Sequence, residues 1–112
     1  MSESTALLAP TPTVTPDEMA ARTFLARYSG NTATTYRYVL AKLFVWCADH
    51  DVAPLRARRP VLELFARDIE AAGLKRSTVA MQLGVVRGFY RYAVIDEYLD
   101  RNPAEHLRLP RV

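Results

Sequence analysis

The sequence has little cysteine, little glycine and no long hydrophobic run, and each of these scarcities excludes a class of protein. A single cysteine in 112 residues excludes an internal disulfide framework and fits a reducing compartment. No apolar stretch approaches the roughly 20 residues that a membrane-spanning helix needs. The N-terminus, MSESTALLAP, lacks the basic start and long apolar core of a secretory signal. We therefore expect one soluble, cytoplasmic domain with no membrane partner.

Apolar residues recur at helical spacing along most of the chain, and no useful stretch alternates as a strand would. Residues 1–14 show no such periodicity and are expected to form a flexible leader. A short fifth helical turn could include Ala104 to Leu107. The prediction is an all-α, compact bundle over residues 15–107, with four principal helices at Pro16–Tyr28, Thr32–Asp49, Pro60–Ala72 and Thr78–Glu97.

Capping residues and apolar faces define these helices. Thr15 and Pro16 are typical of a helix start, Gly73 of the position after a helix end, and Ser77 is predicted to cap the last helix. Side chains that share one helix face are predicted to form the core. They are Met19, Phe24, Leu25, Tyr36, Leu40, Leu43, Phe44, Cys47, Leu62, Phe65, Ile69, Val79, Leu83, Val86, Phe89 or Tyr90, and Ala93.

The sequence offers no convincing catalytic or metal site. Cys47 and His50 lie three residues apart beside Asp49 and Asp51, but no second pair of cysteines or histidines completes a zinc site. Cys47 also falls in the predicted apolar stripe, where a free thiol behaves as a small hydrophobe. We expect no metal, no cofactor and no catalysis by this chain alone. A small enzyme built on Cys47 and His50 is a third, separate hypothesis.

Positive charge is concentrated in the middle of the chain. Residues 52–91 carry eight cations against three carboxylates, a net charge of +5, although the whole chain carries only +3. Such a stretch can be the electrostatic footprint of nucleic-acid binding, or merely a solvated basic surface. Arg56, Arg58 and Arg59 form a loop cluster that we interpret as solvated charge.

Two predicted helices present polar and cationic faces opposite their apolar stripes. Residues 75–78 place two cations, two hydroxyls and free N–H groups at a helix start, where the helix dipole favours an anion. Gly84 and Gly88 allow close approach of either DNA or another helix, and the sequence does not decide between them. The candidate DNA-contacting residues are Thr34, Arg37, Tyr38, Lys42, Lys75, Arg76, Ser77, Thr78, Met81, Arg87 and Arg91.

The order and spacing of several short motifs resemble a known family. Residues 31–36 open the second helix with Asn-Thr and a tyrosine, residues 77–78 open the fourth with Ser-Thr, and Asn-Pro-Ala follows it at 102–104. Residues 16–110 resemble the N-terminal core-binding domain of tyrosine recombinases, the phage-type integrases and Xer-like proteins. The resemblance implies a SAM-like bundle that forms half of a clamp around duplex DNA. Its second and fourth helices would face the major groove of a recombination half-site.

The same resemblance implies a division of labour between domains. In this family a separate C-terminal domain carries the tyrosine nucleophile, and residues 108–112 would be the linker toward it. This chain is therefore expected not to be an enzyme, although its parent protein would be a tyrosine recombinase acting in DNA integration or recombination. We therefore expect none of the six tyrosines of this chain to be the nucleophile: Tyr28, Tyr36, Tyr38, Tyr90, Tyr92 and Tyr98.

The expected partners follow from this interpretation. They are double-stranded DNA, the catalytic domain of the same protein and other recombinase protomers on DNA. The alternative is a helical protein-interaction module without intrinsic DNA binding, which would dock through Val45, Met81, Ile95 and the two helix glycines.

Overall fold

The structure, a computed structural model, describes residues 14–112, and these residues form α-helices, one 3-10 turn and loops, with no strand. The all-α prediction is confirmed for this part of the chain. Most of the predicted leader, residues 1–13, lies outside the described residues. The elements are α2 (Pro16–Leu25), α3 (Gly30–Asp49), η1 (Pro54–Arg56), α4 (Arg59–Ala71) and α5 (Arg76–Ile95).

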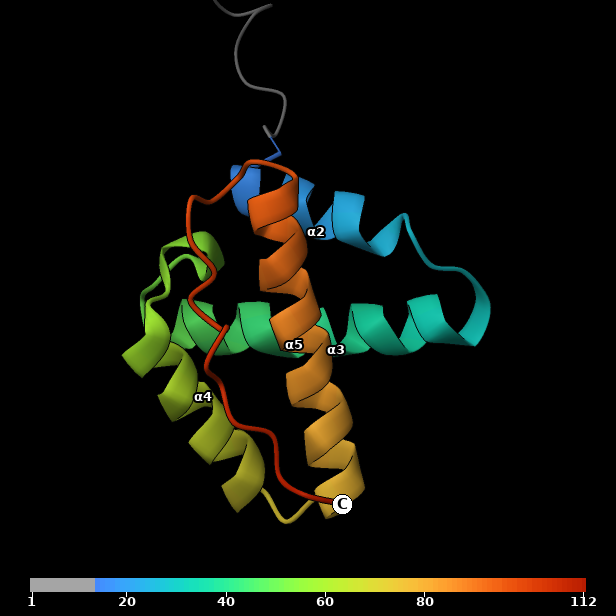
Figure 1. Cartoon of the computed structure of the whole chain (residues 1–112), viewed down its shortest axis with the longest axis vertical. Helices are drawn as coiled ribbons and strands as arrows, with labels where there is room; N and C mark the ends of the chain where they lie inside the picture. The colour runs from blue at the N-terminus through green and yellow to red at the C-terminus, as the bar shows by residue number, and fades with distance from the viewer. Residues whose placement is uncertain (1–13) are drawn as a thin grey trace, which may run out of the picture.

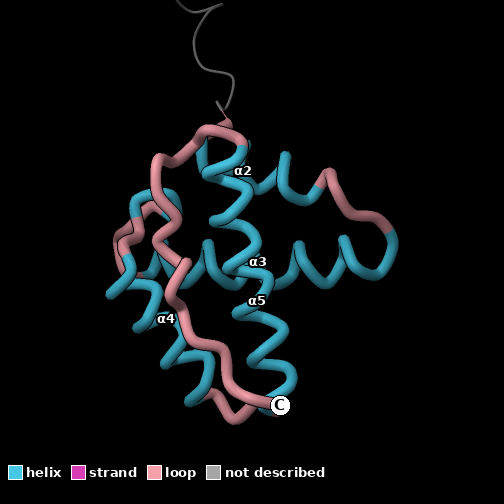
Figure 2. The backbone as a smooth tube through the Cα atoms, viewed as in Figure 1, coloured by secondary structure: helices cyan, strands magenta, loops and turns pink. Residues whose placement is uncertain are grey.

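The two 20-residue helices, α3 and α5, cross each other at a steep angle and form the centre of the fold (Figure 1). α5 packs against α2, α3 and α4, so it is the element that holds the others together. After α5 the chain turns back as a loop along that helix, and the C-terminus lies beside its start (Figure 2). None of the helices in residues 14–112 combines the length and the apolar character needed to cross a membrane.

Apolar faces of all four helices meet in one core, largely as the periodicity predicts. Phe24, Leu43, Leu62, Phe65 and Phe89 are at most 1% exposed. The ring of Phe24 lies 5.9 Å from that of Phe89, which joins α2 to α5. Burial of such side chains supplies about 1.5 to 3 kcal/mol each, and this drives the four amphipathic helices together.

The prediction for Met19 is wrong, because its side chain is 40% exposed. Ala20 and Phe24, four residues apart, occupy the inward face of α2 instead. α2 also ends at Leu25 rather than Tyr28. The N–H groups of Arg27 and Tyr28 bond to carbonyls three residues back, so the chain tightens into turns there.

Of the two predicted N-terminal helix caps, one is confirmed and one is wrong. The Glu18 N–H donates to the Thr15 hydroxyl oxygen over 3.1 Å, as expected of an N-cap threonine. Ser77 is not a cap: α5 begins at Arg76, and Lys75 takes the N-cap position with an extended backbone. The first helical turn therefore starts two residues before the predicted one.

The predicted fifth helical turn at Ala104–Leu107 is a run of hydrogen-bonded turns rather than a helix. The Leu107 N–H bonds to the Ala104 carbonyl over 3.0 Å, and both side chains are buried. The 3-10 turn η1, which the sequence analysis did not predict, begins at Pro54, where the fixed φ of proline suits the start of a helical turn.

Candidate nucleic-acid interface

One pair of polar side chains joins the two crossed helices, α3 and α5, by a hydrogen bond. Thr34, Tyr38 and Lys42 are spaced four residues apart, so they form one line along α3. The Lys42 ammonium donates to the side-chain oxygen of Gln82 on α5 over 3.1 Å, which ties this line to the second helix. We use the name crossing surface for this region, whose members are Thr34, Tyr38 and Lys42 on α3 and Ser77, Thr78 and Met81 on α5.

Gln82 fixes the centre of the crossing surface. Its side chain is 4% exposed, and among the described residues it is the one buried side chain that is neither apolar nor aromatic. A buried amide without a hydrogen-bond partner would cost about 1 to 3 kcal/mol, so Lys42 satisfies a group that the core needs paired. An ammonium has three donors. Lys42, itself half-buried, can therefore keep this bond and still donate to a bound ligand.

The sequence analysis missed Gln82 because a single glutamine in a helix carries no periodic signal. One clue was available, since Gln82 lies three residues after Val79 and four before Val86, on the face of α5 that is buried. A polar residue at such a position requires a partner on a neighbouring helix.

The other members of the crossing surface are accessible to a ligand. Tyr38 is 62% exposed and Met81 40% exposed. The Thr34 hydroxyl donates to the Gly30 carbonyl over 3.3 Å, which leaves its oxygen free to accept. Hydroxyls, a phenol and an ammonium can bond to phosphates and base edges, and a thioether can pack against the methyl group of thymine.

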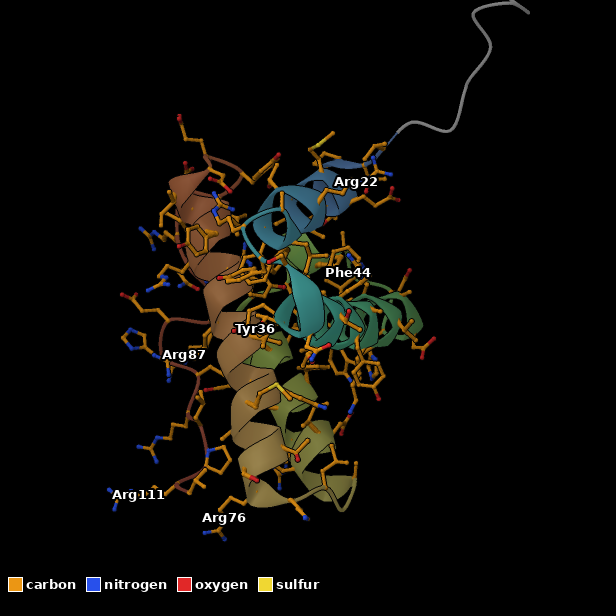
Figure 3. All side chains as sticks on the ribbon, turned by 90° about the vertical axis from the view of Figure 1, so that its right-hand side faces the viewer. Arg22, Tyr36, Phe44, Arg76, Arg87 and Arg111 are labelled. Carbon is orange, nitrogen blue, oxygen red and sulfur yellow. The ribbon has the colours of Figure 1, made fainter. Side chains whose placement is uncertain are left out.

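Arg87 and Arg91 lie on a different side of α5 from Met81. At about 100° per residue, Arg87 is turned about 120° around the helix axis from Met81. Figure 3 shows Arg87 pointing away from α3, toward the C-terminal loop. Both arginines line a cavity of about 530 Å³ together with Asn102 and Glu105 of that loop. The structure thus separates these two candidates from the crossing surface.

The remaining cationic candidates lie at the borders. Arg37 is exposed on the side of α3 that faces α2, where it lines a groove with Arg22. Lys75 and Arg76 are exposed at the start of α5. Figure 3 shows Arg76 and Arg111 at this same end of the helix. The sequence analysis did not single out Arg111, because only the return of the C-terminal loop brings it there.

The two glycines of α5 pack within the domain. A methyl group added at Gly84 would meet the Leu109 side chain at 3.7 Å, and one added at Gly88 would meet the Phe24 ring at 3.7 Å. Both glycines thus face other parts of the domain, at ordinary van der Waals distances that a methyl group would also allow.

Cys47 is a core residue, as predicted. Its side chain is fully buried, and burial raises the pKa of its thiol to about 11. His50 stacks on Trp46 with ring centres 3.8 Å apart, and the Trp46 indole donates to Asp68 over 2.8 Å. Among residues 14–112 no three histidine, cysteine or acidic side chains are grouped so that they could hold a metal ion. A nucleophilic or metal site at Cys47 has no support in this geometry.

Comparison with known proteins gives two matches. The family described as phage integrase, N-terminal SAM-like domain, matches residues 23–97, which include α3, α4 and α5 entirely. The chain is 26% identical over 85 residues to the tyrosine recombinase XerD of Chlorobaculum tepidum. That alignment covers 76% of this chain and 28% of the recombinase, so the chain spans little more than a quarter of that relative. No solved structure matches the chain.

Proposed function

The chain belongs to the family of phage-integrase N-terminal SAM-like domains, and on that basis we propose that it binds duplex DNA at a recombination half-site through the crossing surface. The observation that carries this proposal is the bond from Lys42 on α3 to the buried Gln82 on α5, with the exposed Tyr38 one turn before Lys42 and the exposed Met81 next to Gln82. An exposed aromatic, a cation and a thioether at such a point are well suited to a groove lined by phosphates.

The geometry of two crossed helices suits the major groove. The groove is about 12 Å wide and admits one α-helix, while a second helix that crosses the first can meet the phosphates on its rim. The start of α5 adds two cations, Lys75 and Arg76, and N–H groups that no side chain caps. Such a helix start attracts a phosphate. Arg37, Arg87 and Arg91 lie to the sides and are proposed as flanking contacts of smaller effect.

The parent protein would be a tyrosine recombinase that acts on DNA in the cytoplasm. In this proposal the present domain binds the half-site and holds the DNA in position. The chemistry at the scissile phosphate belongs to a catalytic domain of the same protein. Other protomers bound to neighbouring half-sites would be further partners. The XerD relative is named as a tyrosine recombinase, which supports such a role for the parent protein of this chain.

The alternative of a protein-interaction module has less support. Val45 and Ile95 are 61% and 59% exposed, as a docking surface would require. Ile95 lines the cavity beside the C-terminal loop, whereas Val45 lies on the outward face of α3. Gly84 and Gly88 line the same cavity as Ile95, but Val45 and Met81 do not, so the residues of that hypothesis do not form one surface.

A pair of charge reversals tests the proposal. Lys75→Glu is expected to weaken binding to all duplex sequences alike and to lower the slope of log affinity against log salt by about 1, because one phosphate contact is lost. Arg67→Glu is the matched control, since Arg67 is exposed on α4, outside the crossing surface. Equal losses for both variants, or no binding by the unmodified chain at low salt, would contradict the proposal.

A further inference from the structure

A second cluster of cations lies away from the crossing surface. One cavity of about 830 Å³ is lined by Arg56 and Arg58 between α3 and α4, by Arg59 at the start of α4, and by Arg101 of the C-terminal loop. The sequence suggested only three solvated arginines, and the fold adds a fourth from a segment more than 40 residues away. Figure 2 shows the two loops passing beside each other at the edge of the molecule.

The backbone of the α3–α4 loop is held in place while its cations face solvent. The buried Tyr90 hydroxyl donates to the Pro54 carbonyl over 2.6 Å, and the Leu55 N–H donates to the Asp17 carboxylate over 2.7 Å. Pro54 and Ala57 are buried, whereas Arg56 and Arg58 on either side of Ala57 are exposed. The arginines therefore project from a fixed support, which reduces the entropy lost when they bind a ligand.

Most of this positive charge has no partner within the domain. Arg59 pairs with Glu63 over 3.2 Å, but Arg56, Arg58 and Arg101 form no ion pair or side-chain hydrogen bond with residues 14–112. α4 begins at this cluster, and its N-cap residue, Arg58, supplies no side-chain acceptor to the first N–H groups. The helix dipole therefore adds to the positive potential of the side chains.

We propose that Arg56, Arg58, Arg59 and Arg101 form a second binding site for the phosphate backbone of DNA, separate from the crossing surface. The planar guanidinium group pairs with phosphate oxygens through two parallel hydrogen bonds, and several adjacent arginines match a ligand whose anions repeat along a chain. The proposal goes beyond binding at the crossing surface but rests, like it, on the domain meeting DNA.

The position of the cluster defines what it binds. α3 has 20 residues and is therefore about 30 Å long. The crossing surface extends along this helix from Thr34 to Lys42. The segment that carries Arg56 and Arg58, which we name the arginine loop, follows the end of the helix at Asp49. The arginines would therefore not contact the phosphates that meet the crossing surface. They would contact flanking DNA or a second duplex.

The test counts duplexes bound to the whole chain and locates them on it. The probe is a duplex of mixed sequence of five base pairs, closed by a hairpin loop and about 17 Å long, which is little more than half the length of α3. At low salt the chain is expected to bind two such duplexes, measured by sedimentation. Amide resonances of Leu55, Arg59 and Arg101 are expected to shift together with those of the crossing surface.

The variant Arg56→Gln/Arg58→Gln is expected to bind one duplex, and its salt slope should fall by about 2 because two phosphate contacts are lost. The control Arg22→Gln/Arg67→Gln removes the same charge from exposed positions outside the cluster and should still bind two. Identical behaviour of the two variants would overturn the proposal. The wild-type amide shifts decide the question even if a variant does not fold.

The amide shifts also separate this proposal from the previous one. If the amide resonances of the crossing surface shift and those of the arginine loop do not, the second site alone is overturned. If the amide resonances of the arginine loop shift and those of the crossing surface do not, the function proposed for the crossing surface is overturned and the second site is supported. A polyglutamate chain that binds the loop as tightly as the duplex would indicate an acidic protein as ligand and would overturn the DNA assignment.

Discussion

Replacing Gly88 with alanine should stabilise the domain. Gly88 lies inside α5 with an ordinary helical backbone, and its added methyl group would lie 3.7 and 3.8 Å from two atoms of the Phe24 ring. These are normal van der Waals distances, so nothing has to move. A glycine inside a helix costs about 1 kcal/mol relative to alanine. We therefore expect Gly88→Ala to raise the free energy of unfolding by about 1 kcal/mol, which corresponds to a rise in Tm of roughly 5 °C.

The assay is urea and thermal unfolding followed by circular dichroism, with Gly73→Ala as the opposite control. Gly73 follows α4 with a φ of +84°, a conformation that disfavours side chains. Gly73→Ala should therefore lower the free energy of unfolding by about 1 to 2 kcal/mol, although the space around it is open. Destabilisation by Gly88→Ala would refute the reasoning, because it would mean that α5 and Phe24 lie closer than the structure shows.

Three further predictions concern buried groups. Tyr90→Phe removes the donor to the Pro54 carbonyl and should cost about 1 to 3 kcal/mol in urea unfolding; an unchanged midpoint would argue against that bond. Lys42→Met leaves the Gln82 oxygen without its donor and should cost about 1 kcal/mol in the same assay, whereas no loss would mean that water replaces the ammonium. Burial raises the pKa of the Cys47 thiol from 9.0 to about 11, so the unfolded chain loses this proton first and the free energy of unfolding should fall as the pH rises between these values. Cys47→Ala should flatten that fall, and an equal slope in both proteins would contradict the assignment.

The helices and most of the core could be predicted because they depend on local patterns. The stripes that contain Leu40, Leu62 and Val86 repeat at helical spacing, and each of these side chains is buried. Helix ends were less predictable. Ser77 is a favoured cap residue, yet α5 starts at Arg76, one residue before it, and Lys75 takes the N-cap position without a side-chain cap bond. Local propensity gives only the neighbourhood of such a boundary.

The arrangement of the candidate sites could be predicted only in part. The sequence indicated which residues of α3 and α5 face away from the core, but not how the two helices cross, so the bond from Lys42 to Gln82 was not foreseen. The return of the C-terminal loop was not foreseen either. That loop gives Arg87 different neighbours from Met81 and brings Arg101 to the α3–α4 loop, and such contacts between distant segments leave no periodic signal in the sequence.

The most direct test of DNA binding at the crossing surface is an amide-shift titration of the chain with duplex DNA at low and then moderate salt. Shifts that include Thr34, Tyr38, Lys42 and residues 75–81, and that fade as salt rises, are the predicted result, since phosphate contacts weaken when counterions compete. A spectrum in which these amides stay unchanged at low salt would contradict the account, whatever happens at the arginine loop.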